Sequence, residues 1–369
     1  MEAKPLVVGM SLYSWNSRLL LSAGALVKAK YPPVVLVAGG PDASAKPDRI
    51  YKEGAADIVV AGEGEAVMTD IVASILNGRP LPGPIIRAPL LDPTLLSSPW
   101  LDGTLDPARW GSAALELTRG CPYRCSFCFE SKGSSKLRRF PLDTAEKELV
   151  TFSKAGVEEV FVLDPTFNAD ERRMEDAVRV FREAGPELRY MVELRAELLS
   201  AKQAKLLSGL NCSVQIGLQS SDPKVLANVN RSIDPEIFAR KISLLDSAGV
   251  AYGLDLIYGL PGDTLAGFKR SLDFALGLGP NHLDVFRLAV LPGTELADKA
   301  AQFGLVYDPD APYLVRSTPD FCGEDLDTAE YLARATDLFY SKGRAVMWFR
   351  ALIKLLGTRP SVFLSRFSE

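Results

Sequence analysis

The chain has 369 residues, of which 47% are hydrophobic and 24% charged, as in a folded globular protein long enough for two domains. Its net charge of −4 provides no basic surface for nucleic acid, and no apolar run approaches the ~20 residues of a membrane span. With no signal peptide expected before the first strand and only five cysteines, these features predict a cytoplasmic protein without a membrane or nucleic-acid partner.

The first 75 residues alternate between apolar stretches and segments of helical periodicity. We expect strands at 6–10, 34–38 and 58–60 and helices at 18–30 and 47–54. Continuous apolar strands between helices predict a small, Rossmann-like parallel sheet covered on both faces. Glycine-rich turns follow these strands at 39–40 and 62–64, at the edge where such sheets bind ligands, although turn formation alone also explains them.

Residues 76–112 are predicted to form a linker. Seven prolines lie between Pro80 and Pro107, which makes regular structure unfavourable. Trp100 and Trp110 are expected to pin this segment to the following domain.

Three cysteines with the spacing C-x3-C-x2-C follow a short predicted strand at 114–117. They are Cys121, Cys125 and Cys128, and the aromatic Phe127 precedes the last of them. Three thiolates can hold a cubic iron–sulfur cluster and leave one iron open, as a catalytic site requires. Two alternatives remain: a zinc site, for which this segment offers no fourth cysteine or histidine, and unrelated core cysteines. A disulfide framework is disfavoured because three clustered thiols leave one unpaired.

Strands and helices alternate again beyond the cysteines. The basic stretch 132–139 is either a solvated loop or a contact for an anionic substrate group. Asp143 and Glu146 predict the start of a helix over 145–155. Further strands are expected at 159–163, 190–194, 214–218, 252–257 and 283–290. Together with 114–117 they predict a partial (β/α)6 parallel barrel over residues 113–304, whose strand ends form the active face.

Polar residues gather where these strands end. Glu193 ends the third strand, Gln219 and Ser220 end the fourth, Arg231 follows on the next helix, and Asp255 belongs to the fifth. Such carboxylates and amides can hold ribose hydroxyls, and an arginine can pair with a carboxylate. Helix caps and surface ion pairs are the alternative explanation.

The segment 305–369 leaves the alternation and predicts a C-terminal helical extension, with helices at 325–341 and 345–356 that could close the open side of the barrel. Cys322 is a remote candidate for a hydrogen donor to the substrate, and an ordinary loop cysteine is the simpler interpretation. Cys212 and His282, both at the amino ends of strands, are expected to be structural.

The cysteine spacing, the Thr-Arg-Gly before it and Phe127 resemble the radical S-adenosylmethionine (SAM) superfamily, over about residues 110–310. The resemblance implies that the three cysteines hold a 4Fe–4S cluster whose fourth iron binds the amino and carboxylate groups of SAM. Reductive cleavage of SAM would then give a 5′-deoxyadenosyl radical that functionalises an unreactive carbon of a small molecule or peptide. It also implies a reductant such as flavodoxin or ferredoxin.

The spacing of Gln219, Arg231 and Asp255 resembles that of SAM-contacting residues in the oxygen-independent coproporphyrinogen oxidase branch of this superfamily. By that resemblance Gln219 and Asp255 contact the adenosyl ribose and Arg231 anchors the SAM carboxylate. Glu193, Ser220 and Phe127 are weaker candidates for cofactor contacts. Apart from Cys322, no residue is a candidate for catalysis.

The N-terminal residues resemble the second half of a cobalamin-binding domain, through the segments 9–16, 38–41 and 62–65. Ser11 and Gly39-Gly40 would line a cleft for the nucleotide tail. The opening strands and an Asp-x-His-x-x-Gly motif have no counterpart, so a truncated, three-stranded domain is expected over 1–75. If cobalamin binds, the resemblance implies C-methylation. If this unit has lost the cofactor, it implies rearrangement, bond cleavage or transfer of another SAM-derived group.

Two functions of other classes remain open. One is an electron-transfer protein that carries the cluster without SAM chemistry, and the other is a zinc-stabilised binding module.

Overall fold

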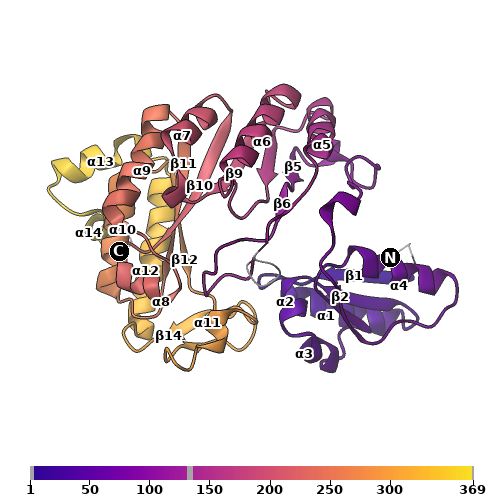
Figure 1. Cartoon of the computed structure of the whole chain (residues 1–369). Helices are drawn as coiled ribbons and strands as arrows, with labels where there is room; N and C mark the ends of the chain where they lie inside the picture. The colour runs from indigo at the N-terminus through magenta and orange to yellow at the C-terminus, as the bar shows by residue number, and fades with distance from the viewer. Residues whose placement is uncertain (1–3, 131–135, 368–369) are drawn as a thin grey trace.

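The computed structural model describes residues 4–130 and 136–367, which form two parallel sheets and a helical C-terminal segment (Figure 1). Within the described part of the chain, no helix is long and apolar enough to cross a membrane.

The N-terminal unit is a four-stranded parallel sheet in the order β1-β2-β3-β4. Its strands are β1 Val7–Ser11, β2 Val35–Gly39, β3 Ile58–Ala61 and β4 Ile85–Arg87. Its helices are α1 Ser17–Lys30, α2 Pro41–Ala45, α3 Pro47–Lys52 and α4 Glu65–Leu76. One face of the sheet packs in a cluster around Leu12, Leu36 and Ile50, and the other around Val60 and Ile71, so the expected cover on both faces is confirmed.

The expectation of three strands and an irregular linker is wrong at β4. Ile85 pairs with Val59 and adds a fourth strand from within the predicted linker, a pairing that no local pattern of three residues among prolines reveals. Short 3-10 turns, η1 Pro93–Leu95 and η2 Pro107–Arg109, follow in the same segment. Trp100 attaches it to the second sheet by donating from Nε1 to the Ala114 carbonyl at 3.2 Å, whereas Trp110 is 66% exposed and does not pin it.

The second sheet has six parallel strands in the order β12-β11-β10-β9-β8-β5. The strands are β5 Ser112–Leu115, β8 Glu159–Val162, β9 Arg189–Leu194, β10 Cys212–Gln219, β11 Ala251–Tyr258 and β12 His282–Arg287. The main helices between them are α5 Leu142–Lys154, α6 Glu171–Ala184, α7 Ala201–Ser208, α8 Pro223–Asn228, α9 Pro235–Ala248 and α10 Leu265–Leu278. The 3-10 turn η4 Ala196–Leu198 follows β9. This is the predicted α/β alternation with six strands.

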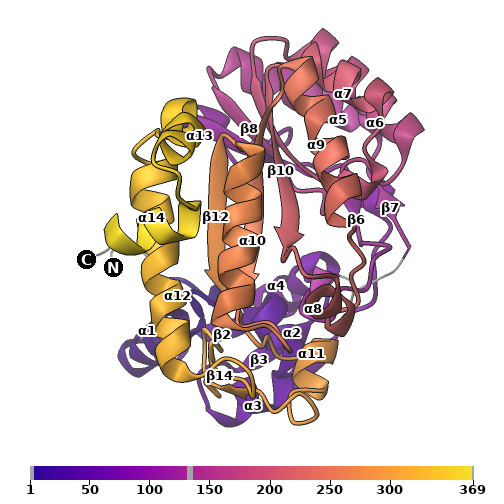
Figure 2. The same ribbon diagram turned by 90° about the vertical axis from the view of Figure 1, so that its left-hand side faces the viewer.

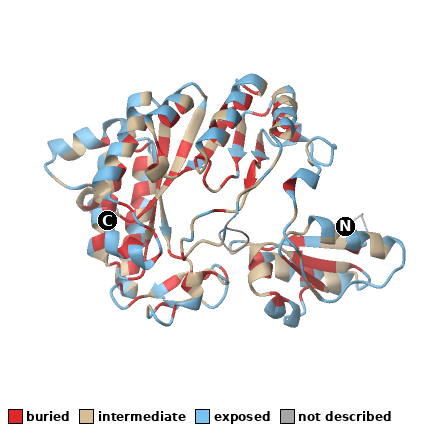
Figure 3. Ribbon diagram, in the orientation of Figure 1, coloured by how far each residue is buried: buried red, intermediate tan, exposed pale blue. Residues whose placement is uncertain are grey.

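Buried and more exposed residues alternate along the strands of the second sheet (Figure 3). The sheet therefore has one packed face and one open face. On β9, Tyr190, Val192 and Leu194 are buried in the core beneath the helices, and Glu193 between them points to the opposite face. Polar side chains of the sheet therefore collect on the face that the helices leave free.

Two local expectations in this region are wrong. Helix α5 begins at Leu142 after Pro141, and Asp143 makes no capping hydrogen bond because it already lies in the first turn. Arg231 lies after the end of α8 and not on a helix, since Asn230 adopts a left-handed φ of 57°.

The C-terminal segment packs along β12 and the outer helices (Figure 2). It contains α11 Glu295–Asp298, the antiparallel pair β13 Val306–Tyr307 and β14 Val315–Ser317, α12 Gly323–Ala335, the π-helical turn η5 Thr336–Ser341, α13 Val346–Leu355 and α14 Pro360–Phe367. The two predicted helices are present. The last helix and the strand pair were not expected.

Candidate functional site

The cysteine loop lies between the two sheets. It follows β6 Thr118–Arg119, which pairs antiparallel with β7 Arg138–Arg139. Ser126 fixes the loop, because its N–H donates to the Val229 carbonyl at 3.1 Å and its carbonyl accepts from Leu296 at 2.8 Å. Lys132, part of the predicted basic stretch, lies outside the described residues, while Arg138 and Arg139 form ion pairs with Glu63 and Asp170.

The side chains of this loop that could bind a metal cluster are three cysteine thiols. Cys121 is buried, and Cys125 and Cys128 are half-buried. In residues 4–130 and 136–367, no three His, Cys, Asp or Glu side chains converge as ligands of a single metal ion. A cubic cluster does not require such convergence, because each thiolate binds a different iron.

Arg195 is a cation that lies beside the cysteine loop. Its Nη1 lies 3.8 Å from Cys125 Sγ, and its guanidinium stacks on the ring of Tyr123, with 3.8 Å from Cζ to the ring centroid. Its Nη2 pairs with Glu197 at 2.8 Å. A cation held by an aromatic ring and a carboxylate beside a cysteine can stabilise negative charge on the sulfur.

Arg231 and Gln219 meet at the end of β10. Arg231 Nη2 donates to the Gly217 carbonyl at 2.8 Å and lies 3.6 Å from Glu197. A Cβ on Gly217 would stand 2.3 Å from Gln219 Nε2 and 3.3 Å from Arg231 Nη1, so glycine permits this close approach. Gln219 Oε1, Arg231 Nε and Arg195 Nε are buried and have no hydrogen-bond partner.

Asp255 lies next to this group because its Cα pairs in register with that of Gly217. It accepts from Gln215 Nε2 at 2.6 Å, and burial, despite that hydrogen bond, raises its pKa to about 7. Glu193 lies beside Gln215 in register. Desolvation, and then the negative charge of Glu130, raise the pKa of Glu193. The register of three neighbouring strands thus brings the predicted polar residues onto one face.

The remaining candidates lie elsewhere. Ser220 is fully buried, its hydroxyl near Ser271 and accepting from the Asp222 N–H, so the fold itself uses that hydroxyl. Phe127 packs against the large core. Cys322 is exposed before α12, Cys212 opens β10, and His282 is on the surface with Asp284 at 2.8 Å.

Two adjoining cavities separate the N-terminal sheet from the cysteine loop. One, of about 590 Å³, lies at the carboxyl ends of β1, β2 and β3 and is lined by Ser11, Gly39 and Gly64 among others. The second, of about 570 Å³, reaches Gly120 and Phe129 of the cysteine loop. Gly40 borders both; its φ is +89°, and a Cβ there would lie 2.8 Å from the Leu12 carbonyl oxygen. Backbone therefore forms much of the wall, as a cleft for a large cofactor requires.

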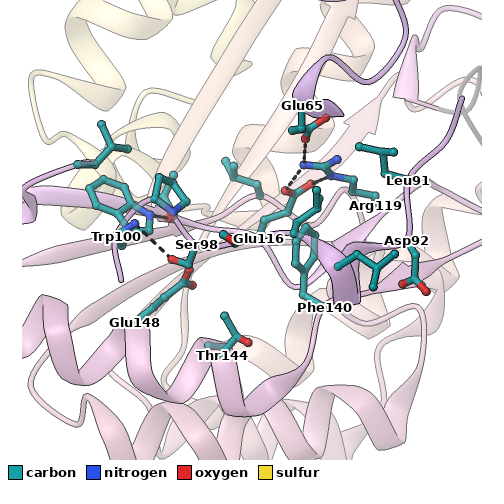
Figure 4. Close-up of a pocket in the computed structure, with 18 of the residues that line it drawn as sticks. Glu65, Leu91, Asp92, Ser98, Trp100, Glu116, Arg119, Phe140, Thr144 and Glu148 are labelled. Carbon is teal, nitrogen blue, oxygen red and sulfur yellow. Dashed lines mark hydrogen bonds and ion pairs between the residues drawn. The ribbon is translucent and has the colours of Figure 1, made fainter. Parts of the chain in front are cut away.

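A third cavity, of about 790 Å³, is drawn in Figure 4. It adjoins the second cavity, with which it shares Glu116 and Arg119. Arg119 at its edge pairs with Glu116 at 2.9 Å and with Glu65 at 2.7 Å. Glu148 faces it from α5, and burial raises the pKa of its carboxyl. Most of the remaining wall is apolar, including Trp100 and Phe140.

Sequence reasoning did not single out Arg195 or Arg119. Arg195 follows the end of β9, where polar residues of a parallel barrel are functional candidates, and that position was its only signal. Arg119 stands two residues before the first cysteine, but its acidic partners could not be found from the sequence because two of them lie in the N-terminal unit.

Comparisons with known proteins match both parts of the chain. Residues 115–275 match the model of the Radical SAM superfamily, and residues 1–72 match that of the B12 binding domain. The chain is 30% identical over 357 residues to the cobalamin-dependent radical SAM methyltransferase TokK of Streptomyces tokunonensis, covering 86% of this chain and 52% of TokK. It is 28% identical over 364 residues to 2-(S-pantetheinyl)-carbapenam-3-carboxylate methyltransferase of Streptantibioticus cattleyicolor, covering 88% of this chain and 53% of that protein.

Among solved structures, the fold is similar to that of the radical SAM methyltransferase TsrM from Kitasatospora setae with cobalamin and a [4Fe-4S] cluster bound. The TM-score is 0.70 at 18% identity, over 84% of this chain and 70% of that one. The chain spans about half the length of the two methyltransferases compared above.

Proposed function

The chain belongs to the radical SAM superfamily, and from that premise we propose that it is a cobalamin-dependent methyltransferase acting on an unreactive carbon of a small organic substrate. The two alternatives of another class, a simple electron carrier and a zinc module, do not explain an N-terminal match to the B12 binding domain.

The observation that carries the proposal is the set of buried polar atoms without partners beside the three-thiol loop. Buried polar atoms in folded proteins are almost always hydrogen-bonded. Gln219 Oε1, Arg231 Nε and Arg195 Nε are not, and they lie on or next to the strand ends that flank the cysteines. A polar ligand with hydroxyl, amino and carboxylate groups would satisfy them, and SAM has all three.

When bound, the cluster would supply the electron that cleaves SAM, and cobalamin would supply a transferable methyl group. Cys121, Cys125 and Cys128 would hold the cluster. Arg231 would pair with the carboxylate of SAM, and Gln219 and Asp255 would receive the ribose hydroxyls. With a pKa raised to about 7, Asp255 can donate a proton to a hydroxyl oxygen or accept from it.

The cavities support a corrinoid at the N-terminal sheet and a small substrate nearby. The glycine-lined cleft provides backbone contacts for a nucleotide tail. The largely apolar third cavity is large enough for a drug-sized molecule. The carbapenam relative is named for a small substrate, and a second TsrM structure contains tryptophan.

The test is anaerobic reconstitution of the full chain with iron and sulfide, followed by SAM, a low-potential reductant and cobalamin. We expect a bound corrinoid and the release of 5′-deoxyadenosine or S-adenosylhomocysteine, abolished by Cys125→Ser and retained by the matched control Cys212→Ser. SAM cleavage without corrinoid binding would favour the cobalamin-independent alternative. Absence of both would refute the proposal.

A further inference from the structure

The cysteine loop is attached to the N-terminal unit at its base. The β6–β7 pair brackets the loop, with Arg119 opposite Arg138 in register. Arg119 stands two residues before the first cysteine, and both arginines reach across to acidic residues that follow β3.

Glu63 is the residue on which these contacts converge. Its carboxylate accepts from Arg138 Nη1 at 2.9 Å and from Arg138 Nη2, and it also accepts from the Leu91 N–H at 2.7 Å. Arg119 Nη1 lies 3.6 Å away. The Glu63 side chain is only 16% exposed, and a two-bond contact with an arginine at low exposure is among the stronger ion-pair geometries.

The turn that carries Glu63 also forms the wall of the proposed corrinoid cleft. Gly62 and Glu63 line both the cleft at the N-terminal sheet and the cavity that reaches the cysteine loop. Gly62 has a φ of +106°, and a Cβ there would lie 2.8 Å from the Ala88 carbonyl oxygen, so the turn has little room to shift. The side chain of Glu63 therefore contacts the base of the cysteine loop and also lines the proposed corrinoid cleft.

We propose that Glu63 couples the two sites, so that filling the cluster site strengthens corrinoid binding and corrinoid binding in turn favours retention of the cluster. A ligand that fixes the cysteine loop also fixes Arg119 and Arg138, and through them the turn at Glu63. Coupling between two binding sites is reciprocal, and typical values lie between about 5-fold and 150-fold. The corrinoid half of this inference rests on the proposed function.

The simpler explanation is that Glu63 only holds the two units together, and the chain offers a matched control for it. Tyr313 donates its hydroxyl to the buried Asp42 of the N-terminal unit at 2.6 Å, in a contact remote in sequence from the cysteine loop. Tyr313→Phe removes another contact that holds the N-terminal unit to the rest of the chain, without touching Glu63 or its arginines. If docking alone matters, Tyr313→Phe and Glu63→Gln should act alike.

The experiment measures the dissociation constant of hydroxocobalamin by equilibrium dialysis, with and without the reconstituted cluster. Wild type and Tyr313→Phe should bind at least about fivefold more tightly with the cluster. Glu63→Gln should bind equally in both states, and so should Arg138→Met, which breaks the same pair from the other side if the first variant folds poorly. Equal affinity in both states of the wild type, or persistent coupling in both variants, would overturn the inference.

A second readout needs no corrinoid. Amide hydrogen exchange in residues 62–65 should slow on cluster reconstitution in wild type and Tyr313→Phe, and not in Glu63→Gln. If the wild type shows this change but binds no hydroxocobalamin, the link from the cluster site to the turn at Glu63 stands, and the corrinoid half of the inference fails together with the proposed methyltransferase function. If it binds the corrinoid but the exchange is unchanged and the affinity is independent of the cluster, the function stands and the coupling fails.

Discussion

Replacing Arg231 with methionine should weaken SAM binding without a large loss of folding stability. The reason is that this guanidinium is buried and incompletely paired. Arg231 is 8% exposed, has one hydrogen bond to the Gly217 carbonyl, lies 3.6 Å from Glu197 and leaves Nε without a partner. Burial, and then the nearby positive charge of Arg195, lower its pKa. The free protein therefore holds a charge that it solvates poorly, and an anionic ligand would correct this.

The expected magnitudes follow from these contacts. Arg231→Met loses one hydrogen bond, which costs about 1 kcal/mol. It also removes an incompletely paired buried charge, and replacing buried charged groups by apolar ones is typically neutral or stabilising by about 1–4 kcal/mol. The stability of the cluster-free variant should thus lie between about 1 kcal/mol below and about 3 kcal/mol above that of the wild type. SAM binding should weaken at least about 30-fold, since truncating one partner of a buried charge pair costs about 2–5 kcal/mol.

Two measurements test these values. Denaturant unfolding of the cluster-free protein gives the stability, and equilibrium dialysis of SAM against the reconstituted protein gives the SAM affinity. Arg240→Met, at an exposed position on α9, is the matched control and should change neither quantity. Unaltered SAM affinity in Arg231→Met, or a loss of several kcal/mol in unfolding free energy, would show that Arg231 serves the fold and refute the reasoning.

Three other variants probe neighbouring parts of the site. Cys125→Ser should lose most of the roughly four irons per chain expected of a 4Fe–4S cluster, while Cys212→Ser keeps them, as iron and sulfide analysis would show; equal iron in both would contradict the assignment. The pKa of Asp255 rises on folding from 3.8 to about 7, so the contribution of this carboxyl to stability is largest below about pH 4 and declines as the pH rises to 7. Denaturant titrations should therefore show that Asp255→Asn loses less stability than the wild type over this range, and an identical pH dependence would count against the assignment. Arg195→Met removes a cation 3.8 Å from Cys125 Sγ that favours the more negative, reduced cluster, so an EPR-monitored redox titration should give a midpoint potential lower by some tens of mV, whereas an unchanged potential would exclude this role.

The parts of the fold that were predictable are those with a local signal. Buried apolar runs between helices identified the six strands of the second sheet and three strands of the first. Strand β4 has only three residues and exists because Val59 and Ile85 pair, which is a tertiary contact. The sequence predicts only a glycine-rich turn before helix α2, yet Pro41 also suits the first position of a helix.

The candidate site also has parts that the sequence predicts from a local signal and parts that depend on tertiary contacts. The cysteine spacing is local, and strand register then places Gly217 beside Asp255, so residues expected at strand ends meet on one face. Arg195 and Cys125 lie 70 positions apart, and Arg138 and Glu63 lie 75 apart. Neither pair follows a periodicity that could be read along the chain, and both were found only from their contacts in the fold.

Three thiolates would leave one iron of the cluster open for SAM, and this open iron is where the proposed chemistry begins. The most direct measurement is pulsed EPR of the reduced, reconstituted protein with SAM that carries ¹⁵N in its amino group and ¹⁷O in its carboxylate. We expect hyperfine coupling from both isotopes to the cluster, lost in Arg231→Met at SAM concentrations that saturate the wild type. A cluster that forms but shows no coupling to either isotope, or zinc in place of iron, would contradict the account.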